Sequence, residues 1–225
     1  MTMTDRPVLY ERAGLEGRSP SPICWRVRIA LAQKGIDHER IQISFADVDK
    51  LQAATGAREV PVLKIAEDLI VGSDDIAAAL DRLDDSHRLR SPSSDALLMS
   101  CQGDLMDRID RLVAPDVLRL LVPGDSEIYQ ASREARFGHR FVELEEMRNV
   151  IELDLAFALG RLEKDLGERA NFGANGPDWG DIAIYCHLLW IAVASSRSWP
   201  HLPANIEAWW EARDAEWRGI CLASQ

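Results

Sequence analysis

The sequence predicts a small α/β domain followed by an all-α domain. Strand-like alternation and helix-like spacing of apolar residues take turns over the first eighty or so residues. The polar segment 84–94, which contains a proline, has the composition of a linker. After it, apolar residues recur at spacings of three and four almost throughout. We therefore expect the α/β domain over residues 5–83 and the all-α domain over residues 95–225.

The first domain is expected to begin with a strand at residues 7–13 and a Gly/Ser/Pro turn at residues 14–22, followed by a helix that ends at Gly35. A strand at residues 38–45 and a short helix at residues 47–56 come next. A hairpin at residues 60–71 then leads to a helix that begins at Ser73. Serine suits that last position because its side chain can cap a helix N-terminus. The resulting β-α-β-α-β-β-α order is that of a thioredoxin-like domain.

The first helix of this domain has one apolar face. Trp25, Ile29 and Ala32 lie on that face at helical spacing. Arg26 and Arg28 fall largely outside it.

The second domain is expected to be helical from its start. Residues 95–113 carry apolar side chains at helical spacing, and Pro115 should bend or end that helix. Residues 135–167 give one or two further helices. Asp178 and Asp181 form an acidic version of the capping box at the start of another helix. Residues 202–217 form a final amphipathic helix.

Composition excludes several classes of function. The net charge of −11 would repel nucleic acid and anionic membrane surfaces. No window approaches the roughly 20 apolar residues of a membrane helix, and the acidic N-terminal stretch is unlike a signal peptide. The histidines show no metal-ligand spacing, so we expect no metal site. The cysteines lie far apart, which is typical of reduced thiols in a cytoplasmic protein; they are Cys24, Cys101, Cys186 and Cys221.

The stretch Ser21-Pro22-Ile23-Cys24 is similar to a dithiol motif C-P-x-C in which a hydroxyl replaces the first thiol. Two interpretations of Ser21 are open. It can be a helix N-cap, which is the commonest role of a Ser-Pro pair before a helix. It can also hold the sulfur of a thiol supplied by another molecule. Ser19 offers a second register for either role, and Cys24 can be either a small buried side chain or a reactive thiol.

Four motifs together resemble the cytosolic glutathione transferase family over essentially the whole chain. They are residues 21–26 at the entry of the first helix, residues 60–63, residues 73–77, and the capped helix at residues 178–181. The form S-P-x-x-W-R is most similar to the bacterial β-etherase and related fungal branches. The stretch WRVRIALAQKGID is similar to the zeta branch, the maleylacetoacetate isomerases.

This resemblance implies that glutathione is the co-substrate and that Ser21 is the catalytic hydroxyl. It implies a cis peptide bond before Pro61, with the backbone of Val60 bonded to the cysteinyl part of glutathione. Ser73 and Asp74 would receive the γ-glutamyl carboxylate at a helix N-terminus. The family usually has an acid before this serine, where this chain has Gly72. The γ-glutamyl amine must then find another anion, for which the candidates are Asp74 and the adjacent Asp75.

A helix N-terminus and a hydroxyl together can lower the pKa of a bound thiol enough to ionise it near neutral pH. A thiol with a pKa near ~8.5 is only a few per cent ionised at pH 7, and the thiolate is the nucleophile. Lowering that pKa by about two units requires roughly 2.7 kcal/mol. A helix N-terminus supplies about 0.3–1 kcal/mol, and a hydrogen bond to a charged group about 1.5–3 kcal/mol. Ser21 would therefore bind a sulfur rather than attack a substrate.

The acceptor substrate is less well defined by the sequence. Apolar residues of the second domain can line its pocket or belong to the core; they are Met99, Met106, Phe137, Trp190 and Trp199. We expect an apolar, aromatic electrophile that is conjugated or cleaved by β-aryl-ether thiolysis, and a homodimer. The alternatives are a zeta-like cis–trans isomerase, a thiol reductase dependent on Cys24, and a non-catalytic binding protein that retains the fold.

Overall fold

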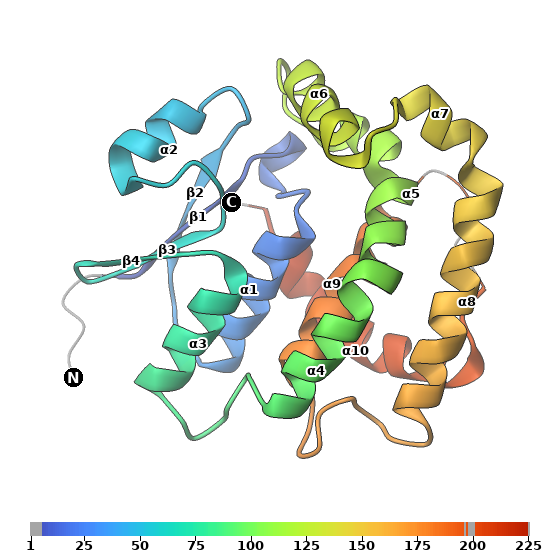
Figure 1. The fold of residues 1–225 in the computed structure, drawn as a ribbon. Helices are drawn as coiled ribbons and strands as arrows, with labels where there is room; N and C mark the ends of the chain where they lie inside the picture. The colour runs from blue at the N-terminus through green and yellow to red at the C-terminus, as the bar shows by residue number, and fades with distance from the viewer. Residues whose placement is uncertain (1–5, 196, 198–200, 225) are drawn as a thin grey trace.

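Four strands form one sheet, in the order β2-β1-β3-β4, in the computed structural model, which describes residues 6–195, 197 and 201–224 (Figure 1). The strands are β1 (Val8–Arg12), β2 (Glu39–Ile43), β3 (Val62–Ile65) and β4 (Asp68–Val71). Strand β1 pairs in parallel with β2 and antiparallel with β3, and β3 pairs antiparallel with β4. The helices of this domain are α1 (Pro22–Gln33), α2 (Val48–Thr55) and α3 (Ser73–Leu83). The expected element order is confirmed.

The two faces of the sheet are covered by different helices. Leu9 and Leu63 pack with Trp25 of α1 in the main core, which also includes α3. A smaller apolar cluster joins Leu51 of α2 to Val62 on the other face. The alternation of side chains along a strand explains this, since neighbouring residues of β3 point to opposite faces. Helices α1 and α3 thus lie between the sheet and the second domain (Figure 1).

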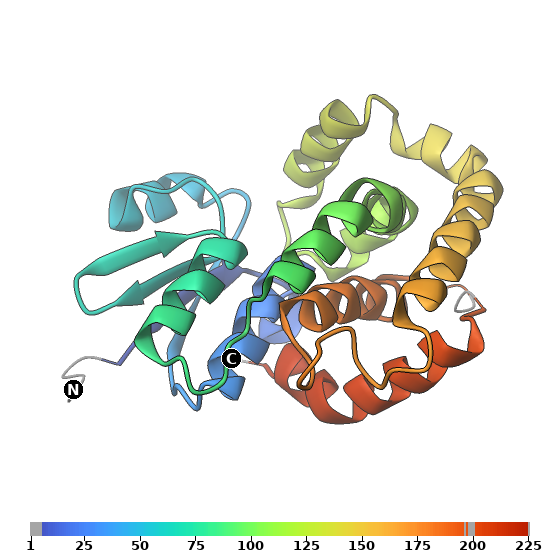
Figure 2. The same ribbon diagram turned by 60° about the horizontal axis from the view of Figure 1, so that its bottom comes forward.

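The second domain contains α4 (Pro92–Cys101), α5 (Asp107–Val117), α6 (Ser126–Phe137), α7 (Phe141–Glu146), α8 (Arg148–Leu166), α9 (Trp179–Ala194) and α10 (Ala204–Leu222). Helix α9 is buried along nearly its whole length and contacts α1, α4, α5 and α10 (Figure 2). The expected capping box is present: Asp178 Oδ1 accepts from Gly180 N at 2.9 Å, and Asp181 Oδ2 accepts from Asp178 N at 3.0 Å. No helix in the described ranges is long and apolar enough to span a membrane.

Two expected boundaries differ in the structure. Helix α4 begins at Pro92 rather than at Asp95, because Ser91 and Ser94 form a capping box around a proline at the first helical position. The connecting segment is shorter as a result. It is fixed by Asp81, whose carboxylate accepts from the backbone N–H groups of Leu89 at 2.8 Å and Arg90 at 2.9 Å.

The single helix expected over residues 95–113 is interrupted. Residues Gln102–Met106 form a π turn between α4 and α5, and such turns occur often at functional sites. Pro115 does not end α5, which continues to Val117 before a 3₁₀ turn. Helix α6 was not expected as a unit, since only Tyr129 and Phe137 of its side chains are buried.

Helix α1 differs most from its expected environment, because Arg26 and Arg28 are buried rather than outside its packed surface. Arg28 forms a paired contact with the buried carboxylate of Glu11 in β1, at 2.5 and 2.7 Å. It also donates to the carbonyls of Cys221 at 2.7 Å and Ala223 at 3.0 Å. Since α1 is enclosed by the sheet, α3, α9 and α10, its charged residues must find partners inside the protein.

Candidate functional site

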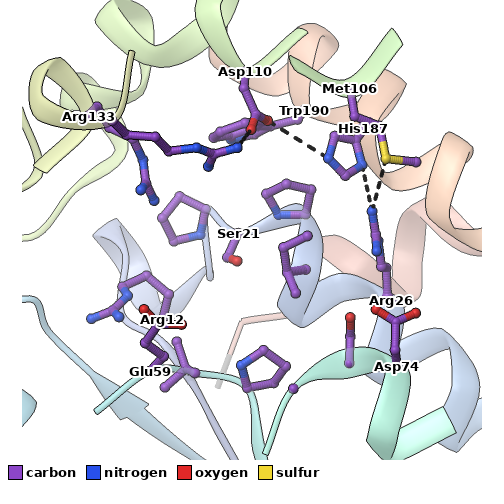
Figure 3. A pocket seen from close by; sticks show the side chains of 18 of the residues that line it. Arg12, Ser21, Arg26, Glu59, Asp74, Met106, Asp110, Arg133, His187 and Trp190 are labelled. Atoms are coloured by element: carbon purple, nitrogen blue, oxygen red, sulfur yellow. Dashed lines mark hydrogen bonds and ion pairs between the residues drawn. The ribbon is translucent and has the colours of Figure 1, made fainter. Parts of the chain in front are cut away.

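A cavity of about 1090 Å³ lies between the two domains. Its first wall contains the start of α1, the segment before β3 and the start of α3. Its second wall contains parts of α4, α5, α6 and α9. Figure 3 shows Ser21 near the centre of this cavity, with Arg12, Glu59 and Asp74 on one side and Arg133 and Asp110 on the other.

Ser21 is the N-cap of α1 and lines the cavity. Its Oγ accepts a hydrogen bond from Cys24 N at 3.4 Å. This bond uses an oxygen lone pair, so the hydroxyl hydrogen remains available to a second partner. The N-cap interpretation of the Ser-Pro pair is therefore confirmed, and the thiol-holding interpretation stays a prediction that this geometry allows. Ser21 caps the helix and can still donate to a group in the cavity.

Ser19 lies in a different environment. It is 1% exposed, it does not line the cavity, and its Oγ has no hydrogen-bond partner within the described residues. Its carbonyl accepts from the indole Nε1 of Trp25 at 2.8 Å, which fixes the turn before α1. The hydroxyl of Ser19, the alternative to Ser21, thus lies inside the protein and not at the cavity.

Cys24 is fully buried and does not line the cavity. Burial raises the pKa of its thiol, and the nearby carboxylate of Glu11 raises it further. The sulfur accepts a hydrogen bond from Arg12 N at 3.4 Å. These features are those of an unreactive structural cysteine, since reactive thiols have a lowered pKa and are accessible.

The peptide bond between Val60 and Pro61 is cis, as expected from the sequence. Both residues line the cavity. The carbonyl of Pro61 accepts from Gly72 N at 2.9 Å, which joins this segment to the start of α3. The two predicted binding segments of the first domain are therefore held side by side.

The start of α3 differs from the expected cap. Gly72, not Ser73, is the N-cap residue, and no side chain among the described residues caps the helix. Gly72 has φ 89° and ψ 144°, a conformation open mainly to glycine. Ser73 becomes the first helical residue, and residues 72–74 line the cavity. A helix N-terminus without a side-chain cap offers backbone N–H groups to an anion.

Asp74 and Asp75 have different surroundings. The carboxylate of Asp74 lines the cavity and accepts from the indole Nε1 of Trp179 at 2.7 Å. Asp75 is exposed and is not part of the cavity wall. The structure thus brings Asp74 together with Ser21, Val60 and Ser73, and leaves Asp75 outside.

The second wall contains three of the apolar residues expected there, Met99, Met106 and Trp190. The indole Nε1 of Trp190 is buried and has no hydrogen-bond partner within the described residues. Phe137 is not part of the cavity wall, because its ring is buried beside the guanidinium of Arg111. Trp199 lies outside the described residues.

A chain of polar side chains runs along the cavity wall from α1 to α6. Arg26 Nη2 of α1 lies 3.2 Å from His187 Nδ1 of α9 and 3.5 Å from Met106 Sδ. His187 Nε2 lies 3.8 Å from Asp110 Oδ1 (Figure 3). Arg136 Nη2 lies 2.8 Å from Asp110 Oδ2. Burial and the adjacent Arg26 lower the pKa of His187 to about 3, so its imidazole is neutral at pH 7. Burial raises the pKa of Asp110.

Sequence reasoning missed most of the charged residues of the cavity, including Arg12, Arg26 and Arg133. One signal was present for Arg12, since Glu11 and Arg12 interrupt an apolar strand. Such charges in a buried strand indicate partners or a site. Across the described parts of the chain, no cluster of histidine, cysteine, aspartate and glutamate could hold a metal ion.

Residues 15–88 match a family model described as glutathione S-transferase, N-terminal domain. The matched residues run from the turn before α1 to the segment before α4. No curated protein matches the chain significantly.

The whole chain is similar to several solved structures. Glutathione transferase GSTFuA3 of Phanerochaete chrysosporium has a TM-score of 0.84 at 18% identity, over 98% of this chain and 99% of that one. The glutathione S-transferase CsGST63524 of Ceriporiopsis subvermispora, in complex with glutathione, has a TM-score of 0.83 at 19% identity, over 98% and 100%. Glutaredoxin 2 of Salmonella typhimurium, in complex with glutathione, has a TM-score of 0.72 at 20% identity, over 96% of each chain. These likenesses establish the fold, a thioredoxin-like domain followed by a helical domain.

Proposed function

We propose that the protein is a glutathione transferase in which Ser21 stabilises the glutathione thiolate. The observation that carries this proposal is the placement of Ser21. Its hydroxyl lies at the N-terminus of α1, in the cavity, and its oxygen accepts from Cys24 N. That backbone bond leaves the hydroxyl hydrogen free to bind a sulfur anion. A hydrogen bond to a charged acceptor is stronger than one to a neutral acceptor, so the thiolate is stabilised relative to the thiol. The family match of residues 15–88 and the two glutathione complexes among similar structures support glutathione as the co-substrate.

The remaining parts of glutathione have matching groups on the first wall. The backbone of Val60 before Pro61 would pair with the cysteinyl residue, as one extended strand pairs with another. The uncapped start of α3 at Ser73 would receive the γ-glutamyl carboxylate. Asp74 would hold the γ-glutamyl ammonium group in place of the acid that the chain lacks at Gly72.

The reaction then proceeds in the second half of the cavity. The thiolate attacks an electrophilic carbon of an apolar, aromatic acceptor, a carbon–sulfur bond forms, and the leaving group departs with its electron pair. The leaving group is a halide in conjugation or an aryloxide in β-aryl-ether thiolysis. Met99, Met106 and Trp190 supply apolar surface for the acceptor.

The thiol reductase dependent on Cys24 is the less favoured alternative. A mixed disulfide requires an accessible thiolate, and Cys24 is fully buried with a raised pKa. We propose further that the protein is a cytoplasmic homodimer, because two-fold dimers are the commonest closed assembly and the resembling family forms them.

Two measurements test this function. Glutathione binding is measured by calorimetry, and turnover is measured with glutathione and the neutral acceptor 1-chloro-2,4-dinitrobenzene. We expect saturable binding and release of chloride. Binding without turnover of any aryl halide, aryl ether or maleyl compound would instead support a binding protein that retains the fold. Absence of binding would refute the proposal.

A further inference from the structure

Arg12 is a buried cation at the cavity whose charge is balanced by no ion pair within the part of the chain that the structure describes. It is 8% exposed and lines the cavity at the end of β1. Its Nη1 donates to the carbonyl of Ile43 at 3.1 Å, and its guanidinium carbon lies 3.8 Å from the centre of the Phe45 ring. No carboxylate in the described ranges forms an ion pair with it. Buried cations normally have an anionic partner.

The charges of Asp125 and Glu59 raise the pKa of Arg12, but neither acid forms an ion pair with it within the described residues. Asp125 is fully buried, and its two carboxylate oxygens accept from the backbone N–H groups of Phe45 at 2.8 Å and Ala46 at 3.1 Å. Glu59 is exposed at the rim of the cavity. Asp125 therefore fixes the loop that carries Phe45, and Phe45 in turn positions Arg12.

Arg133 of α6 is a second cation of the cavity wall, on the side opposite Arg12 (Figure 3). Its guanidinium carbon lies 5.1 Å from the centre of the Tyr129 ring, and it too forms no ion pair within the described residues. Burial lowers the pKa of Arg12, and the charge of Arg133 lowers it further, so the two cations repel each other across this part of the cavity. By contrast, Arg58 and Arg136, which also line the cavity, are paired with Asp49 and Asp110.

Apolar side chains surround the two cations. Phe45 and Tyr129 lie edge to face, with ring centres 5.5 Å apart, and Leu121 and Ile128 extend the same wall. A ligand that fits here must combine an apolar body with an anionic group. Arginine pairs well with carboxylate and sulfonate groups because its N–H donors form a planar fork.

We propose that the acceptor substrate is an aromatic anion whose carboxylate or sulfonate binds between Arg133 and Arg12. That the bound anion is the acceptor substrate rests on the proposed function. The anion site itself does not. Arg133 belongs to the second domain, and Ser21 lies between it and Asp74 of the first wall (Figure 3). An anion held by Arg133 therefore lies across the cavity from the groups proposed to bind the γ-glutamyl end of glutathione.

Binding is tested without glutathione, using two fluorescent probes that differ by one sulfonate. They are 8-anilinonaphthalene-1-sulfonate and its neutral counterpart N-phenyl-1-naphthylamine. We expect Arg133→Gln to weaken binding of the sulfonate about tenfold, as for the loss of a charged hydrogen bond, and to leave the neutral probe unchanged. The control Arg58→Gln removes the same charge from the cavity wall at a residue already paired with Asp49, and should change neither affinity.

Turnover tests whether this anion is the acceptor. With glutathione, the enzyme is given 4-chloro-3-nitrobenzoate and the uncharged 4-chloro-3-nitrobenzamide. In each case the thiolate displaces chloride, so no oxidant or further reactant is needed. Arg133→Gln should raise the KM of the benzoate about tenfold relative to that of the amide. The KM of glutathione should not change.

Three results would overturn the inference: equal weakening of both probes, the same effect from Arg58→Gln, or a raised KM of glutathione in place of that of the benzoate. Failure of the proposed function has a different signature. In that case neither 4-chloro-3-nitrobenzoate nor 4-chloro-3-nitrobenzamide is turned over, while Arg133→Gln still weakens binding of the sulfonate probe and not of the neutral probe.

Discussion

Replacing Ser21 by alanine removes the one side-chain donor that the proposed mechanism places at the sulfur. A hydrogen bond to a charged group contributes about 1.5–3 kcal/mol. Since one pKa unit corresponds to about 1.36 kcal/mol, the bound thiol should become less acidic by about one to two units. The N-terminus of α1 remains and keeps part of the effect. At a pH below the thiol pKa of the wild-type complex, turnover should fall by about 10- to 100-fold.

The thiolate of bound glutathione absorbs in the near ultraviolet, so its pKa can be titrated directly. The titration is run at several glutathione concentrations and extrapolated to saturation, because the glycine at position 72 predicts modest affinity. The wild-type complex should show a pKa below that of free glutathione. Ser21→Ala should raise it toward the free value, and the pH–rate profile should shift by the same amount.

Ser19→Ala is the matched control, since it removes a neighbouring hydroxyl that does not face the cavity. It should leave the pKa unchanged. Ser21→Ala also removes an N-cap, at a cost of at most about 1 kcal/mol for so long a bond. Thermal unfolding measures this separately. A saturated complex of the Ser21 variant whose thiol titrates like that of the wild type would show that Ser21 is only a cap.

Four further outcomes are expected. Cys24→Ala should retain turnover, because the thiol is buried, and loss of all activity in a folded variant would favour the reductase. Asp74→Asn should raise the Kd of glutathione about tenfold by removing a charged partner of the ammonium group, whereas Asp75→Asn should not; calorimetry distinguishes them. His187 has a pKa of about 3 in the native state against 6.5 in the unfolded state, so the native state binds fewer protons between these values. The free energy of unfolding should therefore fall as the pH drops from 6.5 toward 3. Denaturant unfolding at several pH values should show a smaller dependence of this free energy on pH for His187→Gln. Light scattering should give the mass of two chains, and a single-chain mass at micromolar concentration would contradict the dimer.

Local signals in the sequence predicted much of the first domain. Ser21 before Pro22 marked the start of α1, and Gly35 and Gly56 marked the ends of α1 and α2, where both glycines have a positive φ. The cis bond before Pro61 followed from the family resemblance. These features depend on a few adjacent residues, so they can be read without knowledge of the partner elements.

The rest depended on contacts between distant parts of the chain. Arg26 and Arg28 were expected outside the packed face of α1, but this helix is enclosed on all sides and both arginines have buried partners. Arg133 gave no sequence signal, because α6 has few buried positions and the role proposed for Arg133 depends on Arg12, which is distant in the sequence. Single-helix periodicity could not reveal a cavity between two domains.

The first wall of the cavity offers hydrogen-bond donors and an acceptor that together suit the carboxylate and the ammonium group of an amino acid. An α-carbon with a carboxylate and an ammonium group requires donors and an acceptor a few ångströms apart. The uncapped start of α3 provides the donors at Ser73, and the carboxylate of Asp74 follows in the same helical turn. Trp179 donates to Asp74 at 2.7 Å and keeps that carboxylate at the cavity. Because Gly72 supplies the backbone conformation but no side chain, the acid has to come from within the helix. In the proposed glutathione complex, Asp74 would therefore be the partner of the ammonium group in place of an acid at position 72.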